Sequence, residues 1–344
     1  MTAPRLPHRA RRRPARAIVV PVLASLVLAG CGGDDGGDAA GEKSGRDGAA
    51  AATDTWPLTG LPARRGADQR HPVIVVKIDN TASSAPQAGL GGADLVVEEL
   101  VEGGSTRLAA FFYSRLPDVV GPVRSMRASD LGILGGTDAV VATSGAAQVT
   151  LDRIGAAGVT YVTEGSAGFY RADDRSAPYD LMARLPEVAD ALRTPRAVRP
   201  PDYLDFAADP ELPEGRRADG VAAVFSGGHT TAWRRDGDAY VVQDGYAAAD
   251  DGFRADTVLI LRVQVGDAGY RDPAGNPVPE TKLAGEGAAL LVHGGRAITA
   301  RWSKPAPDAT ISLTTADGTP LSVPAGHTWI ELVPAQGGDV TLTR

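Results

Sequence analysis

Runs of hydrophobic residues divide the part of the chain before residue 200 into alternating candidate strands and helices. Short apolar or alternating runs, typical of strands, occupy residues 73–78, 94–101, 106–113, 139–143 and 159–162. Apolar residues at helical spacing predict helices near 147–156 and 182–192. Strands interleaved with helices favour an α/β domain, which we expect to span residues 56–200.

The pattern changes after residue 200, where candidate strands follow one another without a helical segment between them. These strands, separated by Gly and Pro turns, are expected at 221–225, 239–243, 258–265, 288–293, 297–302, 310–314 and 328–333. Prolines concentrate between residues 195 and 213, so we place a domain boundary there. Residues 201–344 are therefore predicted to form a mainly antiparallel, β-rich domain.

Paired glycines suggest a register for one hairpin of the first domain. Glu102-Gly103-Gly104-Ser105 fits a two-residue turn, because Gly-Gly supplies the positive φ angles that such turns require. The implied register pairs Leu100 with Arg107. One face of the hairpin would then be apolar except for Glu99, which would need a partner or a raised pKa. Arg107 would lie on the other face, beside Glu98 and Glu102.

The first 31 residues have the pattern of a bacterial lipoprotein signal peptide. Arginines precede an apolar run from Ala17 to Leu28, which is shorter than the roughly 20 residues that a membrane-spanning helix needs. The run ends in Leu28-Ala29-Gly30-Cys31, which matches a lipobox, so we expect cleavage before Cys31 and a diacylglyceryl group on its thiol. Two acyl chains would hold the protein at the outer face of the cell membrane. A permanent transmembrane anchor and a chance cysteine are the alternatives.

Cys31 is the only cysteine of the chain, so no internal disulfide can form. Residues 32–55 consist mainly of Gly, Asp, Ala, Ser and Glu, and they are predicted to be a disordered tether because they have almost nothing to bury. We expect the globular part to begin near Trp56.

Composition and motifs exclude several functions. A net charge of −7 and an exported location argue against nucleic acid as a partner. The sequence has no Gly-x-Ser-x-Gly, phosphate loop, His-Glu-x-x-His or Cys/His cluster, so we predict no cofactor or metal site and identify no catalytic residue. A Ser-His-Asp triad leaves no such signature, and nothing favours one here. The histidines at 71, 229, 293 and 327 are isolated and are expected to be structural or surface residues.

A cluster of arginines and acids is the candidate ligand site. Arg124 and Arg127 stand three positions apart near a predicted helix start, where they would share a face with free backbone N–H groups. Guanidinium groups suit phosphate or carboxylate, so these two arginines and Arg107 would hold an anionic ligand. Glu98 or Glu99 would then act as acid, base or orienter. The alternative, favoured by the matched number of opposite charges, is an internal salt-bridge network.

Polar residues at the end of the first predicted strand extend this site to Lys77, Asp79 and Asn80, because strand ends in α/β sheets often line sites. Asp79 and Asn80 would equally suit a turn, which their residue types favour. In the second domain Trp302 and Trp329 lie in β segments. Tryptophan there is mostly a core residue and less often a platform for stacking a glycan.

Several of these segments together resemble the YerB-like lipoproteins, a family of bacterial envelope proteins whose function is not established. The resemblance is carried by Lys77-Ile78-Asp79-Asn80, Pro86-Gln87-Ala88-Gly89-Leu90, Glu102-Gly103-Gly104-Ser105-Thr106-Arg107, Gly121-Pro122-Val123-Arg124-Ser125 and Gly326-His327-Thr328-Trp329-Ile330. It implies an N-terminal and a C-terminal domain in this order and a lipid anchor, but no activity. Ala177-Pro178-Tyr179-Asp180-Leu181 departs from the family's Pro-His-Asn-Leu-like segment, so histidine-dependent chemistry is not expected here.

Three functions remain open from the sequence. The leading hypothesis is a non-catalytic lipoprotein that binds an anionic cell-wall or lipid-linked ligand, or a partner protein, through the arginine cluster. The second is an enzyme that acts on phosphate-linked cell-wall polymers or their precursors. The third is a structural scaffold for other envelope proteins.

Overall fold

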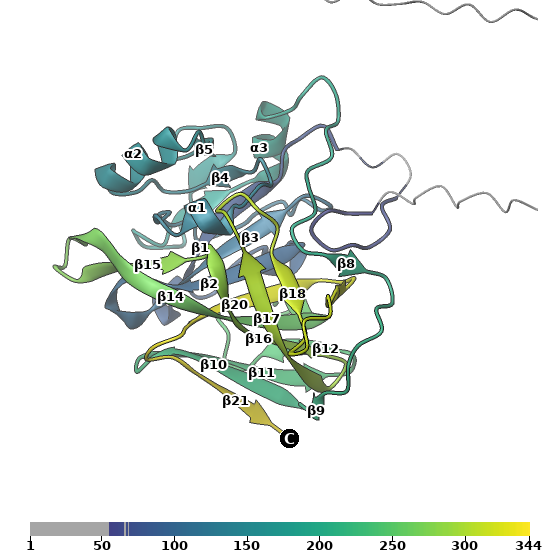
Figure 1. Cartoon of the computed structure of the whole chain (residues 1–344). Coiled ribbons are helices and arrows are strands. Elements are labelled where there is room, and N and C mark those ends of the chain that lie inside the picture. The colour runs from purple at the N-terminus through teal and green to yellow at the C-terminus, as the bar shows by residue number, and fades with distance from the viewer. Residues whose placement is uncertain (1–54, 65–66, 68) are drawn as a thin grey trace, which may run out of the picture. The chain divides into compact units, whose positions relative to one another are not determined.

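The computed structural model describes residues 55–64, 67 and 69–344 (Figure 1). The predicted signal peptide, the predicted lipidation site Cys31 and all of the predicted tether except Thr55 lie outside these residues. Among the described residues no helix has the length and apolar character needed to cross a membrane.

A mixed sheet of 12 strands runs through both halves of the chain (Figure 1). The first half contributes β1 (Ile74–Asn80), β2 (Leu95–Leu100), β3 (Thr106–Phe112), β4 (Val140–Ala142) and β5 (Tyr161–Val162). The second contributes β9 (Arg216–Arg217), β14 (Thr257–Arg271), β15 (Pro277–Lys282), β16 (Gly285–His293), β17 (Arg296–Lys304), β18 (Ser312–Thr314) and β20 (Thr328–Pro334). The main order is β18-β17-β16-β14-β20-β2-β3-β1-β4-β5, so the parallel pair β20 and β2 joins the two halves.

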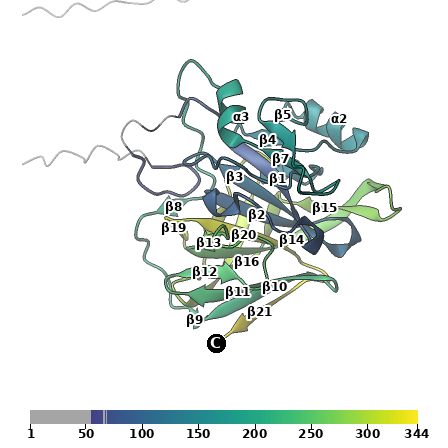
Figure 2. The ribbon, with the colours of Figure 1, turned by 180° about the vertical axis from the view of Figure 1, so that it is seen from behind.

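A second sheet of five strands packs against one face of the large sheet (Figure 2). Its strands are β10 (Gly220–Ser226), β11 (His229–Asp236), β12 (Ala239–Val242), β13 (Arg254–Ala255) and β21 (Asp339–Thr343). Two small sheets pair β6 (Phe169–Arg171) with β7 (Leu181–Ala183), and β8 (Phe206–Ala207) with β19 (Val323–Pro324). The second sheet turns Phe225, Trp233 and Tyr240 into a core shared with Val96 and Trp329.

Helices are short and gather at the end of the molecule away from the second sheet (Figures 1 and 2). They are α1 (Asp130–Ile133), α2 (Gln148–Ala156) and α3 (Leu185–Ala191), with 3-10 turns at Ala82–Ser84, Leu90–Gly92 and Glu102–Gly104. Helix α2 connects the parallel strands β4 and β5, as a crossover requires. The fold as a whole is mainly β. The predicted helices near 147–156 and 182–192 correspond to α2 and α3.

Strand alternation places two cores on opposite faces of the large sheet. Val97 and Phe111 belong to one core, and Val96 and Phe112 belong to the other. Apolar residues therefore occupy both sides of β2 and β3. This explains why these segments appear in the sequence as nearly continuous hydrophobic runs.

The predicted register of the β2–β3 hairpin is wrong by one residue. Leu100 pairs with Thr106, and Glu99 pairs with Arg107. The connection is longer than two residues, because Val101 N donates to Ser105 O at 2.8 Å. A shift of one residue turns every side chain of a strand to the other face. Arg107 therefore lies on the face of Glu99 and not beside Glu98.

The predicted helix start around Arg124 is also wrong. Residues 121–129 form no helix, and α1 begins only at Asp130. Val123 forms a bridge with Ile78, and Arg124 N donates to Lys77 O at 2.7 Å. The backbone N–H of Arg124 is thus already used by β1 and is not available to an anion.

Candidate ligand-binding site

Strand alternation divides the predicted site residues between the two faces of the large sheet. Asp79 and Asn80, predicted to form a turn, both belong to β1. Lys77 and Asp79 share a face with Glu99 and Arg107, as the pairings of β1 and β2 with β3 require. Asn80 and Glu98 point to the opposite face. The predicted site is therefore two separate clusters.

The first cluster is a buried charge network formed by Lys77, Glu99 and Asp130. Lys77 Nζ lies 2.9 Å from Glu99 Oε1 and 2.7 Å from Asp130 Oδ1, and none of the three side chains is exposed. Burial raises the pKa of Glu99 although Lys77 opposes this shift. Burial alone would lower the pKa of Lys77, but the two carboxylates raise it. Lys77 is therefore an ammonium ion enclosed by acids.

The arginines of the predicted site are paired with acids at the edge of this network. Arg107 Nη2 and Arg124 Nε lie 3.3 and 3.2 Å from the same atom, Asp79 Oδ2. Arg127 donates two hydrogen bonds to Glu102, of which that from Nε is 2.9 Å long. Burial lowers the pKa of Arg107 to about 10, although Asp79 opposes this. One carboxylate oxygen thus serves two guanidinium groups.

The second cluster surrounds Glu98 on the opposite face of β2, and we call it the Glu98 cluster. Asn80 Nδ2 donates to Glu98 Oε1 at 2.9 Å, and Thr231 Oγ1 lies 2.9 Å from both carboxylate oxygens. His229 Nε2 lies 2.9 Å from Oε1. Burial by itself would raise the pKa of Glu98, but His229 and Thr106 lower it below its ordinary value. Glu98 is thus an ionised acid held by mostly neutral donors.

Glu331 lies beside Glu98, because β20 and β2 pair in parallel with these two residues opposite each other. Trp233 Nε1 donates to Glu331 Oε1 at 2.6 Å. Burial and the charge of Glu98 raise the pKa of Glu331 well above its ordinary value. Two adjacent carboxyl groups thus have pKa values shifted in opposite directions, as expected when like charges share a buried site.

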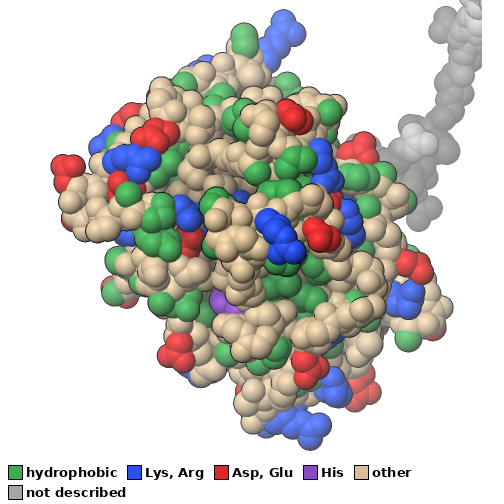
Figure 3. All heavy atoms as spheres, turned by 90° about the vertical axis from the view of Figure 1, so that its left-hand side faces the viewer, with side chains coloured by type: hydrophobic (Ala, Val, Ile, Leu, Met, Phe, Trp, Pro, Cys, Tyr) green, Lys and Arg blue, Asp and Glu red, His purple; other side chains and the backbone are tan. Residues whose placement is uncertain are grey.

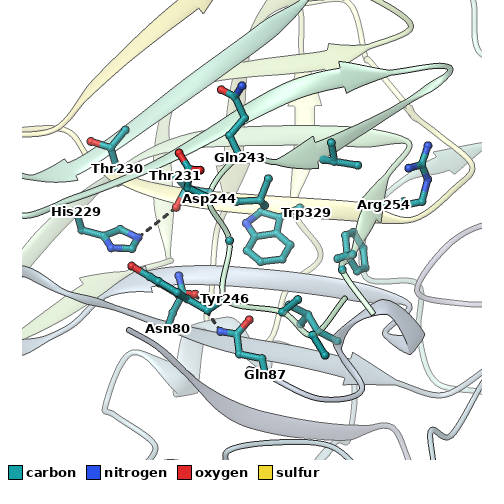
Figure 4. Close-up of a pocket in the computed structure, with 18 of the residues that line it drawn as sticks. Asn80, Gln87, His229, Thr230, Thr231, Gln243, Asp244, Tyr246, Arg254 and Trp329 are labelled. Carbon is teal, nitrogen blue, oxygen red and sulfur yellow. Dashed lines mark hydrogen bonds between the residues drawn. The ribbon is translucent and has the colours of Figure 1, made fainter. Parts of the chain in front are cut away.

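A cavity of about 540 Å³ opens over the Glu98 cluster (Figure 4). Trp329 lies in the middle of the view, with His229 on one side and Arg254 on the other. The polar lining residues are Asn80, Gln87, His229, Thr230, Thr231, Gln243, Asp244, Tyr246, Asp250 and Arg254. The volume falls within the roughly 300–1,000 Å³ that is typical of small-molecule sites.

One wall of this cavity is the segment between β12 and β13, which hydrogen bonds hold to residues 87–91. Gln87 N donates to Tyr246 O at 2.6 Å, and Ala248 N donates to Gln87 O at 2.8 Å. Gly91 N donates to Asp251 O at 2.9 Å. Backbone hydrogen bonds therefore hold this wall in place.

Sequence reasoning missed the residues that the second half contributes to this site. His229, expected to be a structural or surface residue, lines the cavity and contacts Glu98. No motif of the sequence marks Thr231 or Glu331 as a site residue. The sequence does contain a hairpin signal for β11, because Gly227 and Gly228 stand between two segments in which hydrophobic and polar residues alternate as in strands. Ser226 and His229 indeed face each other across this two-residue turn.

Acidic and basic side chains are interspersed over the face of the molecule shown in Figure 3. The described residues contain no group of three His, Cys, Asp or Glu side chains arranged to hold a metal ion.

Comparisons with known proteins place the chain among relatives of the resembled family. It is 36% identical over 128 residues to "Putative lipoprotein YerB" of Bacillus subtilis (strain 168), and this match covers 36% of the chain and 38% of the relative. The crystal structure of YerB protein from Bacillus subtilis has the same fold, with a TM-score of 0.69 and 22% sequence identity. That match covers 83% of this chain and 99% of the YerB chain.

Two family models match in order. Residues 58–197 match the N-terminal domain of a protein of unknown function, DUF3048, and residues 221–330 match its C-terminal domain. The two matches together span most of the described residues, and the strands of both meet in the large sheet. The chain therefore belongs to the DUF3048 family.

Proposed function

We propose that the protein is a lipid-anchored binding protein of the cell envelope whose ligand occupies the cavity over the Glu98 cluster. The observation that carries the proposal is the way in which buried Glu98 fixes Asn80, His229 and Thr231 at the floor of that cavity. Side chains that are locked by hydrogen bonds beneath a site favour binding because little conformational entropy is lost when the ligand arrives.

The anchor in this proposal is lipid on Cys31, with the folded part on the extracytoplasmic face of the membrane. The lipobox-like sequence that ends at Cys31 supports it, as does the similarity to a protein named as a lipoprotein. The proposal also keeps an α/β description for residues 56–200, which the parallel β4–α2–β5 crossover supports.

Retention of cell-wall fragments by the full-length protein in detergent tests this proposal. Fragments released by enzymatic digestion of sacculi would be passed over immobilised wild-type protein and over His229→Ala and Arg124→Glu variants, and the retained fraction measured by mass spectrometry. We expect retention by wild type and Arg124→Glu, and at least about a tenfold loss for His229→Ala, which removes an anchored polar group from the cavity floor. Equal retention by His229→Ala and wild type would contradict the proposal.

A second candidate keeps an anionic ligand at Arg107 and Arg124. The two guanidinium groups share a single oxygen of Asp79, and the Arg124 side chain is 23% exposed and lies 5.2 Å from the centre of the Tyr179 ring. Their other hydrogen bonds go to backbone carbonyl oxygens, those of Ser125 and Pro178, so a phosphate would give them a second anionic partner. In the retention experiment this candidate predicts the reverse result, with loss for Arg124→Glu alone.

Catalysis at the two predicted acids gains no support from their surroundings. Glu98 and Glu99 have no exposed side-chain surface, and both are engaged by partners. A cell-wall polymer would have to displace these partners before it reached either carboxylate. We therefore favour binding over the action on phosphate-linked polymers considered from the sequence.

A further inference from the structure

We infer that the cavity takes an uncharged, hydroxyl- and amide-bearing ligand, such as a short segment of neutral oligosaccharide, in preference to an anionic polymer. This inference rests on the proposed function and names the ligand class for the same site. Three properties of the lining carry it: the charge of the rim, the free hydrogen-bonding groups, and the apolar part of the lining.

The rim of the cavity is unfavourable to anions. Asp244 and Asp250 line it with exposed side chains. Arg254 already has an acidic partner, since it donates to Asp236 Oδ2 at 2.8 Å and to Asp236 O at 3.0 Å. The imidazole of His229 is held by Glu98 at 2.9 Å. An incoming phosphate or carboxylate would therefore meet acids without an uncommitted guanidinium group to compensate them.

Two polar groups that line the cavity have no internal partner. Within the described part of the chain, the side chains of Gln243 and Tyr246 make no hydrogen bond to another residue. Hydroxyl and carboxamide groups donate and accept at once. Sugar hydroxyls and acetamido groups have the same dual character, so each of these side chains can pair with such a ligand without burying an unpaired charge.

Apolar side chains line the cavity beside the polar residues of its floor. Trp329 and Phe253, whose ring centres lie 5.6 Å apart, are 2% and 4% exposed, and Val241, Val242 and Ala247 add partly exposed apolar surface. An apolar surface framed by hydroxyl and amide groups matches a sugar ring, which has an apolar face and a polar edge. Highly charged ligands gain less from an apolar lining because they must lose hydration against it.

Three probes of similar length but different charge test the inference with the full-length protein in detergent. They are chitotetraose, which is neutral and bears acetamido groups, its de-N-acetylated and therefore cationic form, and a short polyglycerol phosphate, which is anionic. We expect chitotetraose to bind most tightly in calorimetric titrations, and Gln243→Ala or Tyr246→Ala to weaken its binding about tenfold. Gln148→Ala, the same change at an exposed residue of α2 away from the cavity, is the matched control and should leave affinity unchanged.

Several results would overturn the inference. If the anionic or the cationic probe bound more tightly than chitotetraose, and Gln243→Ala weakened that binding, the cavity would select a charged ligand. That result would reject the inferred ligand class and leave the proposed function standing. The ligand class alone would also be rejected if neither Gln243→Ala nor Tyr246→Ala changed the affinity for chitotetraose. The same holds if chitotetraose did not bind while retention of cell-wall fragments still depended on His229. Fragment retention that does not depend on His229 would reject the proposed function itself.

Discussion

Glu98 and Glu99 are consecutive residues of β2, yet their carboxyl groups have opposite surroundings. Glu99 faces a charged partner, Lys77, in a region without exposed side-chain surface, and burial raises its pKa. Glu98 faces an amide, a hydroxyl and an imidazole beneath a cavity, and its pKa is lowered. A single strand thus contributes to a structural charge network on one face and to the floor of a candidate binding site on the other. Two acids that look equivalent in sequence therefore differ in what their replacement should do.

The largest expected effect is on the Glu99 side. Lys77→Met would leave two acids without their ammonium partner, and breaking a buried ion pair in this way costs about 3–5 kcal/mol. Urea unfolding should show this loss. The triple variant Lys77→Met, Glu99→Gln, Asp130→Asn removes all three charges and should recover most of it. A loss below about 1 kcal/mol for the single variant would show that the network is not structural.

A smaller loss is expected on the Glu98 side. Glu98→Gln replaces a charged acceptor of several hydrogen bonds with a neutral group, which should cost about 2 kcal/mol of unfolding free energy. The variant should also lose retention of cell-wall fragments, whereas the Lys77 triple variant should keep it. Equal retention by Glu98→Gln and wild type would remove the functional difference between the two faces.

Replacement of Glu331 should have little effect on stability at low pH and should stabilise the protein relative to wild type as the pH rises. An acid whose folded pKa is raised retains its proton longer in the folded state, so its contribution to stability falls as pH increases from the unfolded value near 4.5. Glu331→Gln removes this dependence and keeps a similar shape. Urea midpoints measured for both proteins between pH 4 and pH 8 should diverge in favour of the variant. Parallel curves would contradict the raised pKa.

The smallest effect is expected at the rim of the cavity. The pair between Arg254 and Asp236 is exposed on both sides, so Arg254→Ala should leave the urea midpoint unchanged. Because a neutral ligand has no charge for the guanidinium group to pair with, affinity for chitotetraose should change less than about twofold. A large loss of affinity would indicate that the arginine recognises an anionic group of the ligand.

Local sequence patterns predicted most strand positions because apolar runs and glycine turns act over a few residues. The register of the β2–β3 hairpin failed for a physical reason: the Gly-Gly signal locates the turn but does not say whether Val101 belongs to a strand or to the loop. That one residue decided whether Arg107 would lie beside Glu98 or beside Glu99. The family resemblance supported the order of the two halves without correcting this register.

The candidate site depended on contacts that no local pattern contains. His229 is 131 positions from Glu98, and it reaches the site only because the second sheet packs onto the large one. The pairing of β2 with β20 brings in Glu331 in the same way. Lys77, Asp79 and Asn80 were predicted as site residues, but the alternation of β1 separates Lys77 and Asp79 from Asn80.

Tryptophan side chains report directly on the two faces of the large sheet. Trp329 lines the cavity, whereas Trp56 and Trp302 belong to the core on the Glu99 side. The indole N–H signals of the full-length protein would be followed by NMR while fragments of digested sacculi are added. The proposed site predicts that the Trp329 signal shifts with fragment concentration while those of Trp56 and Trp302 stay in place. The proposed site would be contradicted if the Trp56 or Trp302 signal shifted while the Trp329 signal stayed in place.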